Sequence, residues 1–167
     1  VLDPSHPTMG IDYIRWDVEY YQVFPYQNDP RPNYLYDEDA NGSFYIRNSD
    51  NRENNITSDY VWVNYRLKSP YMTEGDIVID SRWTTEEPET YVMEYDNDSQ
   101  LYTNSILQKQ GYYSYQYLWV TDDGLTHPLP SEGNFYQTEN QYQVLVYYKG
   151  IGERTWRLVA FSQIIIR

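Results

Sequence analysis

The sequence contains no cysteine and only two histidines, so several kinds of chemistry are excluded at once. Without cysteine the chain has no disulfide, no thiolate nucleophile and no cysteine-ligated metal. Positive charge is also scarce, because 12 Lys and Arg stand against 25 Asp and Glu, which gives a net charge of −13. Since phosphate binding needs clustered Lys and Arg, this balance excludes nucleic acid as the main partner and disfavours an anionic lipid surface.

Long apolar runs are absent as well. No segment approaches the roughly 18 apolar residues of a membrane helix, and the N-terminus does not have the pattern of a signal peptide. We therefore expect a chain that is not membrane-embedded. A length of 167 residues fits one domain, or one domain with an extra subdomain. Residues 1–5, VLDPS, read like the interior of a longer polypeptide, so we expect an excised domain.

Tyrosine is present in excess, with 21 residues, and aromatic residues make up 18% of the chain. Disordered chains are poor in aromatic residues, so this composition indicates a folded protein in spite of its polarity. Tyrosine favours strands, and its ring is apolar with one polar end. The composition therefore predicts an all-β protein with aromatic side chains on both faces of its sheets.

The apolar residues recur mainly at every second position, which is the period of a half-buried strand. In residues 59–68, one face carries the apolar side chains and the other carries Trp62, Asn64 and Arg66. No segment shows a sustained helical period. We expect eight to ten strands in a β-sandwich. The expected core includes Val61, Val63, Leu67, Tyr115, Val144, Val146 and Leu158.

A stretch rich in Pro and Asn, from about residue 25 to residue 58, interrupts the strand pattern. It either divides an N-terminal strand region from the main sandwich or forms a long decorated connection. We assign residues 1–58 to N-terminal strands and a connection that pack on the sandwich. Residues 59–167 are assigned to the sandwich itself.

One acidic run resembles the start of a calcium loop. Asp37, Asp39 and Asn41 occupy the alternate positions of the pattern D-x-D-x-N-G, where oxygen ligands converge on Ca²⁺. The complete pattern needs a bidentate acid at loop position twelve, which is Asn48 here. Asn-Gly between two strand-like runs also predicts a hairpin turn. We expect a turn without structural calcium and keep these three residues as candidate metal ligands.

No catalytic motif is evident. His6 and His127 lack the context of a catalytic triad, and the patterns of zinc proteases, phosphate loops and serine hydrolases are missing. A pair of carboxylates for glycoside hydrolysis stays open, because their spatial pairing cannot be seen in a sequence. We expect no enzyme, no catalytic residue and no cofactor.

Three aromatic residues are the candidate binding residues. Tyr60 and Trp62 lie opposite the apolar face of their strand, and Trp83 lies in the loop SRWTTEE. Exposed aromatic rings bind sugars by stacking and bind proteins as anchors. The alternative interpretation is that Trp62 and Trp83 are buried under loops.

Residues 59–124 resemble the early-set, glycogen-binding immunoglobulin-like modules. The resemblance is carried by the second half of the module, through Leu107, Gly111, Tyr113, Tyr115, Tyr117 and Gly124. Of the module's sugar-binding motif, Gly-x-Phe-Asn-x-Trp, only Trp83 is matched. The resemblance implies an immunoglobulin-like antiparallel β-sandwich, here with extra N-terminal strands. It also implies a carbohydrate-binding module as one possible function.

A closer resemblance covers nearly the whole chain. It is carried by residues 39–44 (DANGSF), 58–63 (SDYVWV), 132–142 (EGNFYQTENQY) and 144–148 (VLVYY). These runs look like the second domain of a Bacteroidota domain-of-unknown-function family that is linked to the plug protein of the type IX secretion system. The family implies an exported protein at the periplasmic face of the outer membrane. There, an outer-membrane translocon protein would be its partner.

These observations predict a non-catalytic protein-interaction domain of an exported, outer-membrane-associated protein. Its mechanism would be steric and adhesive, because tyrosine gives contact area at low entropic cost. Carbohydrate binding by a module of the glycogen-binding type is the alternative.

Overall fold

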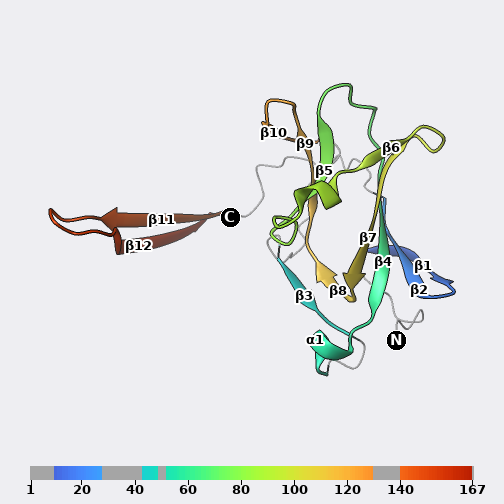
Figure 1. Ribbon diagram of the computed structural model, residues 1–167, viewed down its shortest axis with the longest axis horizontal. Coiled ribbons are helices and arrows are strands. Elements are labelled where there is room, and N and C mark those ends of the chain that lie inside the picture. The colour runs from blue at the N-terminus through green and yellow to red at the C-terminus, as the bar shows by residue number, and fades with distance from the viewer. Residues whose placement is uncertain (1–9, 28–42, 49–51, 130–139, 167) are drawn as a thin grey trace. The chain divides into compact units, whose positions relative to one another are not determined.

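The computed structural model describes residues 10–27, 43–48, 52–129 and 140–166 (Figure 1). The chain divides into two compact units. The larger unit consists of residues 1–33 and 37–134, and the smaller one consists of residues 34–36 and 135–167. The first two strands, from the segment 1–58, share a sheet with strands from the segment that begins at residue 59.

The larger unit is an all-β sandwich, as predicted (Figure 1). Its five-stranded sheet has the order β1 (Ile11–Asp17), β2 (Tyr20–Pro25), β4 (Tyr60–Leu67), β7 (Leu101–Lys109) and β6 (Glu94–Asp96). A three-stranded sheet has the order β10 (Thr126–Pro128), β9 (Gln116–Val120) and β5 (Asp76–Asp80). The short strands β3 (Phe44–Ile46) and β8 (Gly111–Tyr113) pair with each other. The extra N-terminal strands are β1 and β2.

The strand pairs of this unit are antiparallel except for one. Strand β2 runs parallel to β4, with Gln22 beside Trp62. The two helical segments are single turns, α1 (Asn54–Thr57) and the 3₁₀ helix η1 (Pro88–Tyr91). Within the described ranges, no helix has both the length and the apolar character needed to cross a bilayer.

The core lies between the two larger sheets. The alternation of β4 turns Tyr65 and Leu67 toward it, and their exposed fractions are near zero. The full cluster joins both sheets and consists of Tyr65, Leu67, Ile77, Ile79, Met93, Tyr102, Ile106, Tyr117 and Leu129. A smaller cluster forms around Val23 and Val61. The predicted burial of Val61 and Leu67 is confirmed, whereas Val63 and Tyr115 are half-buried against the main cluster.

The smaller unit contains a hairpin of β11 (Asn140–Tyr148) and β12 (Arg157–Ile166). Every residue of both strands is exposed, including Val144 at 52%, Val146 at 46% and Leu158 at 50%. The prediction that these three residues are buried is wrong. A sheet of two strands cannot cover either of its own faces, and no other described strand joins this sheet.

Candidate interaction surface

The five-stranded sheet has one face turned away from the core. Because Val61, Tyr65 and Leu67 point inward, the alternate residues of β4 point outward. Register places Gln22 and Leu107 beside Trp62. We define the outer face as the outward side chains of β1, β2, β4 and β7, which are Tyr13, Arg15, Asp17, Tyr20, Gln22, Phe24, Tyr60, Trp62, Asn64, Arg66, Leu101, Thr103, Ser105, Leu107 and Lys109.

One end of the outer face is a stack of aromatic rings and guanidinium groups. Tyr13 and Phe24 lie opposite each other on β1 and β2, with ring centroids 4.3 Å apart and planes 13° from parallel. The guanidinium carbon of Arg66 lies 5.5 Å from the centroid of Tyr13 and 5.3 Å from that of Phe24. Arg15 lies 5.9 Å from the Phe24 centroid. Cations over ring faces at these distances are attracted by the ring quadrupole.

Hydrogen bonds fix the arginine at the centre of this stack. Arg66 Nη2 donates to Asp12 Oδ2 at 3.0 Å and to the carbonyl oxygen of Pro25 at 3.1 Å. Arg66 Nε is buried and has no hydrogen-bond partner among the described residues. A planar guanidinium that is stacked and bonded in this way loses little further freedom when another molecule binds.

A row of polar side chains crosses the outer face beside Trp62. Asn64 Nδ2 donates to Gln22 Oε1 at 2.9 Å, and Ser105 Oγ donates to Asn64 Oδ1 at 2.7 Å. This row links β2, β4 and β7 and fixes the orientation of both amides. The outer face is therefore rigid in its polar part as well as in its aromatic part.

Tyr60 and Trp62 are on the outer face together, as the alternation of β4 predicts. Trp62 is half-buried, and the Tyr60 side chain is 50% exposed. The ammonium nitrogen of Lys109 lies 5.4 Å from the Tyr60 ring centroid. The structure thus joins these two candidates to Tyr13, Phe24 and Arg66, which sequence reasoning did not select. The available signal was the position of Tyr13 and Arg15 opposite the apolar face of their strand.

The third candidate, Trp83, is elsewhere. Its ring is half-buried against the main core cluster and makes edge-to-face contacts with Tyr91 and Tyr113, both with centroids 5.4 Å apart. Trp83 Nε1 donates to the carbonyl oxygen of Ser114 at 3.1 Å. These contacts hold the loop after β5 against the sandwich, so Trp83 does not belong to the outer face.

Tyr65 on β4 and Tyr113 on β8 have raised pKa values. Burial raises the pKa of Tyr113 to about 12, and its hydroxyl donates to the carbonyl oxygen of Lys109. Burial also raises the pKa of Tyr65 well above its ordinary value, and its hydroxyl donates to Gln108 Oε1 at 2.8 Å. Both residues line a hollow of about 280 Å³ beside Val61 and Val63. At neutral pH both hydroxyls are protonated and serve as structural donors.

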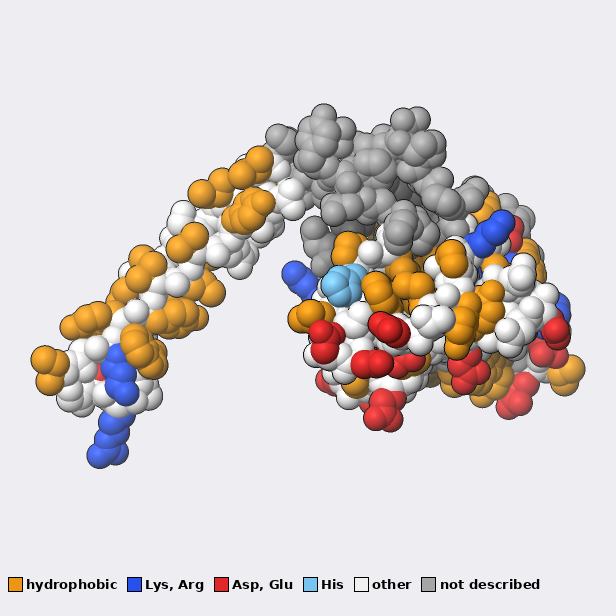
Figure 2. Space-filling view, turned by 90° about the horizontal axis from the view of Figure 1, so that it is seen from above, with side chains coloured by type: hydrophobic (Ala, Val, Ile, Leu, Met, Phe, Trp, Pro, Cys, Tyr) orange, Lys and Arg blue, Asp and Glu red, His pale blue; other side chains and the backbone are white. Residues whose placement is uncertain are grey.

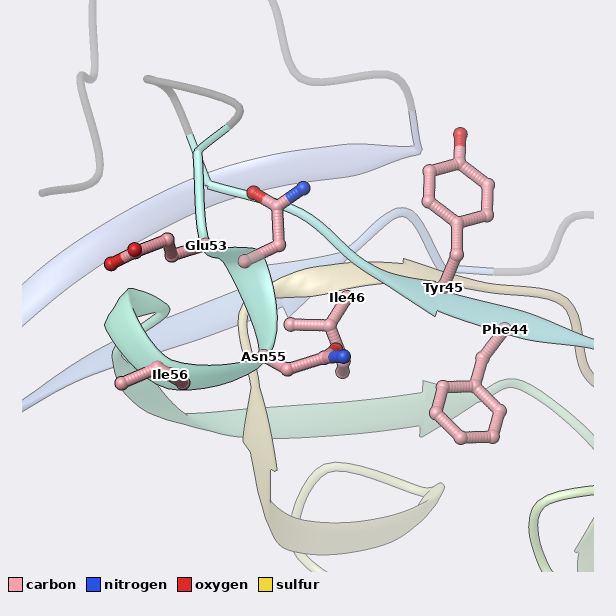
Figure 3. A pocket seen from close by; sticks show the side chains of 7 residues that line it. Phe44, Tyr45, Ile46, Glu53, Asn55 and Ile56 are labelled. Carbon is pink, nitrogen blue, oxygen red and sulfur yellow. The ribbon is translucent and has the colours of Figure 1, made fainter.

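A second hollow, of about 580 Å³, lies between β3 and α1 (Figure 3). Phe44 and Tyr45 project to opposite sides of β3, and Glu53 extends away from both of them (Figure 3). The carboxylate of Glu53 is the one acid among the lining residues, which are Phe44, Tyr45, Ile46, Glu53, Asn54, Asn55 and Ile56. Since glycosidases generally use two carboxylates, this lining lacks the pair that such hydrolysis requires.

The candidate metal ligands Asp37, Asp39 and Asn41 lie outside the described residues. Within the described part of the chain, no three His, Asp or Glu side chains gather closely enough to hold a metal ion. The acidic turn at Asp96 is closed by its own hydrogen bonds, because Asp96 accepts from the backbone of Asp98 and from Ser99. These bonds lower the pKa of the Asp96 carboxyl.

Among solved structures, a bacterial protein is similar to this chain over nearly its whole length. No family model and no curated protein matches the chain. The crystal structure of a hypothetical protein from Parabacteroides merdae is similar, with a TM-score of 0.87 and 30% sequence identity. The match covers 99% of this chain and 43% of that chain, so this chain spans less than half the length of its structural neighbour.

Proposed function

We propose that the chain is a non-catalytic protein-interaction domain that binds its partner through the outer face. The observation that carries the proposal is the fixed cluster of Tyr13, Phe24 and Arg66 on the same open sheet face as Tyr60 and Trp62. Tyr, Trp and Arg are the residues that dominate binding energy at protein interfaces. Because hydrogen bonds and stacking already hold these side chains, binding immobilises few of them.

The charge of the outer face indicates the chemistry of its partner. The chain as a whole is strongly acidic, yet Arg15, Arg66 and Lys109 gather here over aromatic rings. We expect a partner that brings apolar side chains to the rings and carboxylates to Arg15. Such a contact weakens as salt rises, because ions screen exposed charges beyond about 8 Å at physiological ionic strength.

The setting that we propose is an exported, outer-membrane-associated protein, with the domain acting in a plug of the type IX secretion translocon. Support comes from the runs EGNFYQTENQY and VLVYY, which resemble the plug-linked family. The source of the structural neighbour, a Parabacteroides species of the Bacteroidota, is compatible with that setting. In such a role the domain works by filling space and adhering, and it needs no catalytic group.

Co-purification from Bacteroidota outer membranes tests this function. Tagged protein with the native outer face should retain a translocon component, and Trp62→Ala should reduce the retained amount at least about tenfold, as expected for an interface anchor. Trp16→Ala is the matched control, since Trp16 is an exposed tryptophan that packs against Tyr21 on the other face of the sheet. Equal retention by the two variants, or no translocon component with the wild type, would refute the proposal.

Carbohydrate binding is the second candidate, favoured by a specific arrangement. Trp62 lies beside the amides of Gln22 and Asn64, and an aromatic ring next to amide groups is a common way to hold a sugar. Titration calorimetry with maltoheptaose and glycogen decides between the candidates. We expect no measurable heat. A heat that disappears in Trp62→Ala would favour the carbohydrate module on the outer face, and one that disappears in Trp83→Ala would move the sugar site to the loop.

A further inference from the structure

The β11–β12 hairpin exposes apolar side chains on both of its faces. On one face Tyr142 lies opposite Ile164, and on the other face Leu145 lies opposite Phe161. All four side chains are about half exposed. Figure 2 shows hydrophobic side chains along the length of the hairpin and Lys and Arg side chains at its end. An apolar surface of this extent marks an interaction site, because single exposed apolar residues are common but continuous ones are not.

The edges of the hairpin are open as well as its faces. Its sheet has two strands, so among the described residues the outer backbone groups of β11 and β12 have no neighbouring strand. Isolated two-stranded hairpins are marginally stable in water, and open strand edges pair readily with other strands. The hairpin therefore needs an occupant that covers two apolar faces and pairs with at least one edge.

A second copy of this hairpin fits that need poorly. Two hairpins that pair edge to edge would make a wider sheet with both faces still open. Two that stack face to face would still leave their outer faces exposed. A folded domain with a groove can cover both faces and offer a strand edge at the same time, which is the geometry of strand addition.

The structural neighbour is a longer polypeptide, and the part of it outside the match has room for such a domain. Its match covers 99% of this chain, so it includes both strands of the hairpin, yet it accounts for only 43% of that longer chain. A domain that is tethered in the same polypeptide is present at a high effective concentration, in the millimolar range for short linkers. The turn end of the hairpin is also basic, in a chain whose net charge is −13. Lys149, Arg154 and Arg157 lie there beside a single acid, Glu153, which pairs with Arg157 at 3.6 Å.

We propose that the β11–β12 hairpin is a docking arm that joins this unit to a further domain of the same polypeptide. That domain pairs with an edge of the hairpin, packs apolar side chains on both faces, and presents an acidic surface to Arg154 and Arg157. The proposal does not depend on the outer face, which serves a separate partner.

Hydrogen exchange measured by mass spectrometry tests the proposal on the full polypeptide encoded by the gene, beside the 167-residue chain. We expect peptides from 140–148 and 157–166 to exchange at least about 100-fold more slowly in the full polypeptide, with a monomeric mass in both samples. Leu145→Asp in the full polypeptide should restore fast exchange there. Ile151→Asp is the control with the same charge, because Ile151 lies in the turn and is fully exposed.

Three results would overturn the docking arm. A gene that encodes no further domain removes its occupant. Slow exchange already present in the 167-residue chain assigns the cover of the hairpin to that chain itself if the mass is monomeric, and to a second copy if the mass is doubled. Fast exchange in both samples shows that nothing in the polypeptide covers it. None of these results affects the co-purification test with Trp62→Ala. In turn, Trp62→Ala should leave hydrogen exchange of the hairpin unchanged. Failure of the docking arm can therefore be distinguished from failure of the outer face as a binding surface.

Discussion

Tyrosine serves two purposes in this protein, and the difference lies in what its hydroxyl meets. Tyr65 and Tyr102 are buried in the core with their hydroxyls hydrogen-bonded, to Gln108 and to the backbone nitrogen of Met72. Tyr13 and Tyr60 keep their rings on the open outer face. Because the ring is apolar and the hydroxyl is polar, one residue type suits both places.

The buried hydroxyl of Tyr65 provides the first prediction. Tyr65→Phe removes a 2.8 Å hydrogen bond and leaves Gln108 Oε1 without that donor, so the free energy of unfolding should fall by about 1–3 kcal/mol. Urea denaturation measures the change. Tyr60→Phe is the control, since loss of an exposed hydroxyl should change the free energy of unfolding by less than about 0.5 kcal/mol. Equal effects of the two variants would contradict the assigned role.

The raised pKa of Tyr113 predicts a loss of stability at alkaline pH. Its folded pKa is about 12 and its unfolded pKa is near 10. The stabilising contribution is therefore complete below pH 10 and disappears as the pH rises from about 10 to 12, because the unfolded chain releases the proton first. Urea denaturation across this range should show the decline, and Tyr113→Phe should reduce its slope. A slope identical to that of the wild type would refute the assignment.

At the scale of elements, the start of β5 depends on a glycine. Gly75 has a φ of +70°, and a Cβ there would lie 2.1 Å from the carbonyl oxygen of Val120 on β9. Gly124 has a φ of +80° with open space around it, so Gly124→Ala tests the backbone conformation alone. We expect Gly124→Ala to cost about 1–2 kcal/mol. Gly75→Ala should cost about 2 kcal/mol more, because backbone atoms must move. Thermal denaturation that ranks the two variants equally would contradict this.

At the scale of the whole molecule, stability belongs to the larger unit. Both core clusters are made of residues between 11 and 129. A chain that ends at residue 134 should therefore unfold cooperatively at the same temperature as the complete chain in calorimetry, within error. Val146→Asp should likewise leave that transition in place, contrary to what its alternation in the sequence predicts. A large drop in melting temperature for either variant would show that the hairpin contributes to the core.

The sequence alone determined the class of the fold and the two sides of β4. Both follow from local chemistry, because the alternation of side chains along a strand is a property of the backbone itself. This alternation correctly assigned Val61 and Leu67 to the core face of β4 and Tyr60 and Trp62 to its outer face. The excess of tyrosine predicted an all-β protein. The two-residue period, with eight to ten expected strands and no helical period, predicted a β-sandwich.

Only the tertiary structure decided what those side chains meet. The pairing of β2 with β4 carries Phe24 to Arg66, across 42 positions of the chain, and no local pattern encodes that register. Packing of the loop after β5 placed Trp83 against the core rather than on the outer face. Alternation in β11 and β12 marked their apolar residues correctly but could not show whether another sheet covers them. Burial is a relation between elements distant in the sequence, so a strand's own residues fix its faces and only its neighbours fix which face is buried.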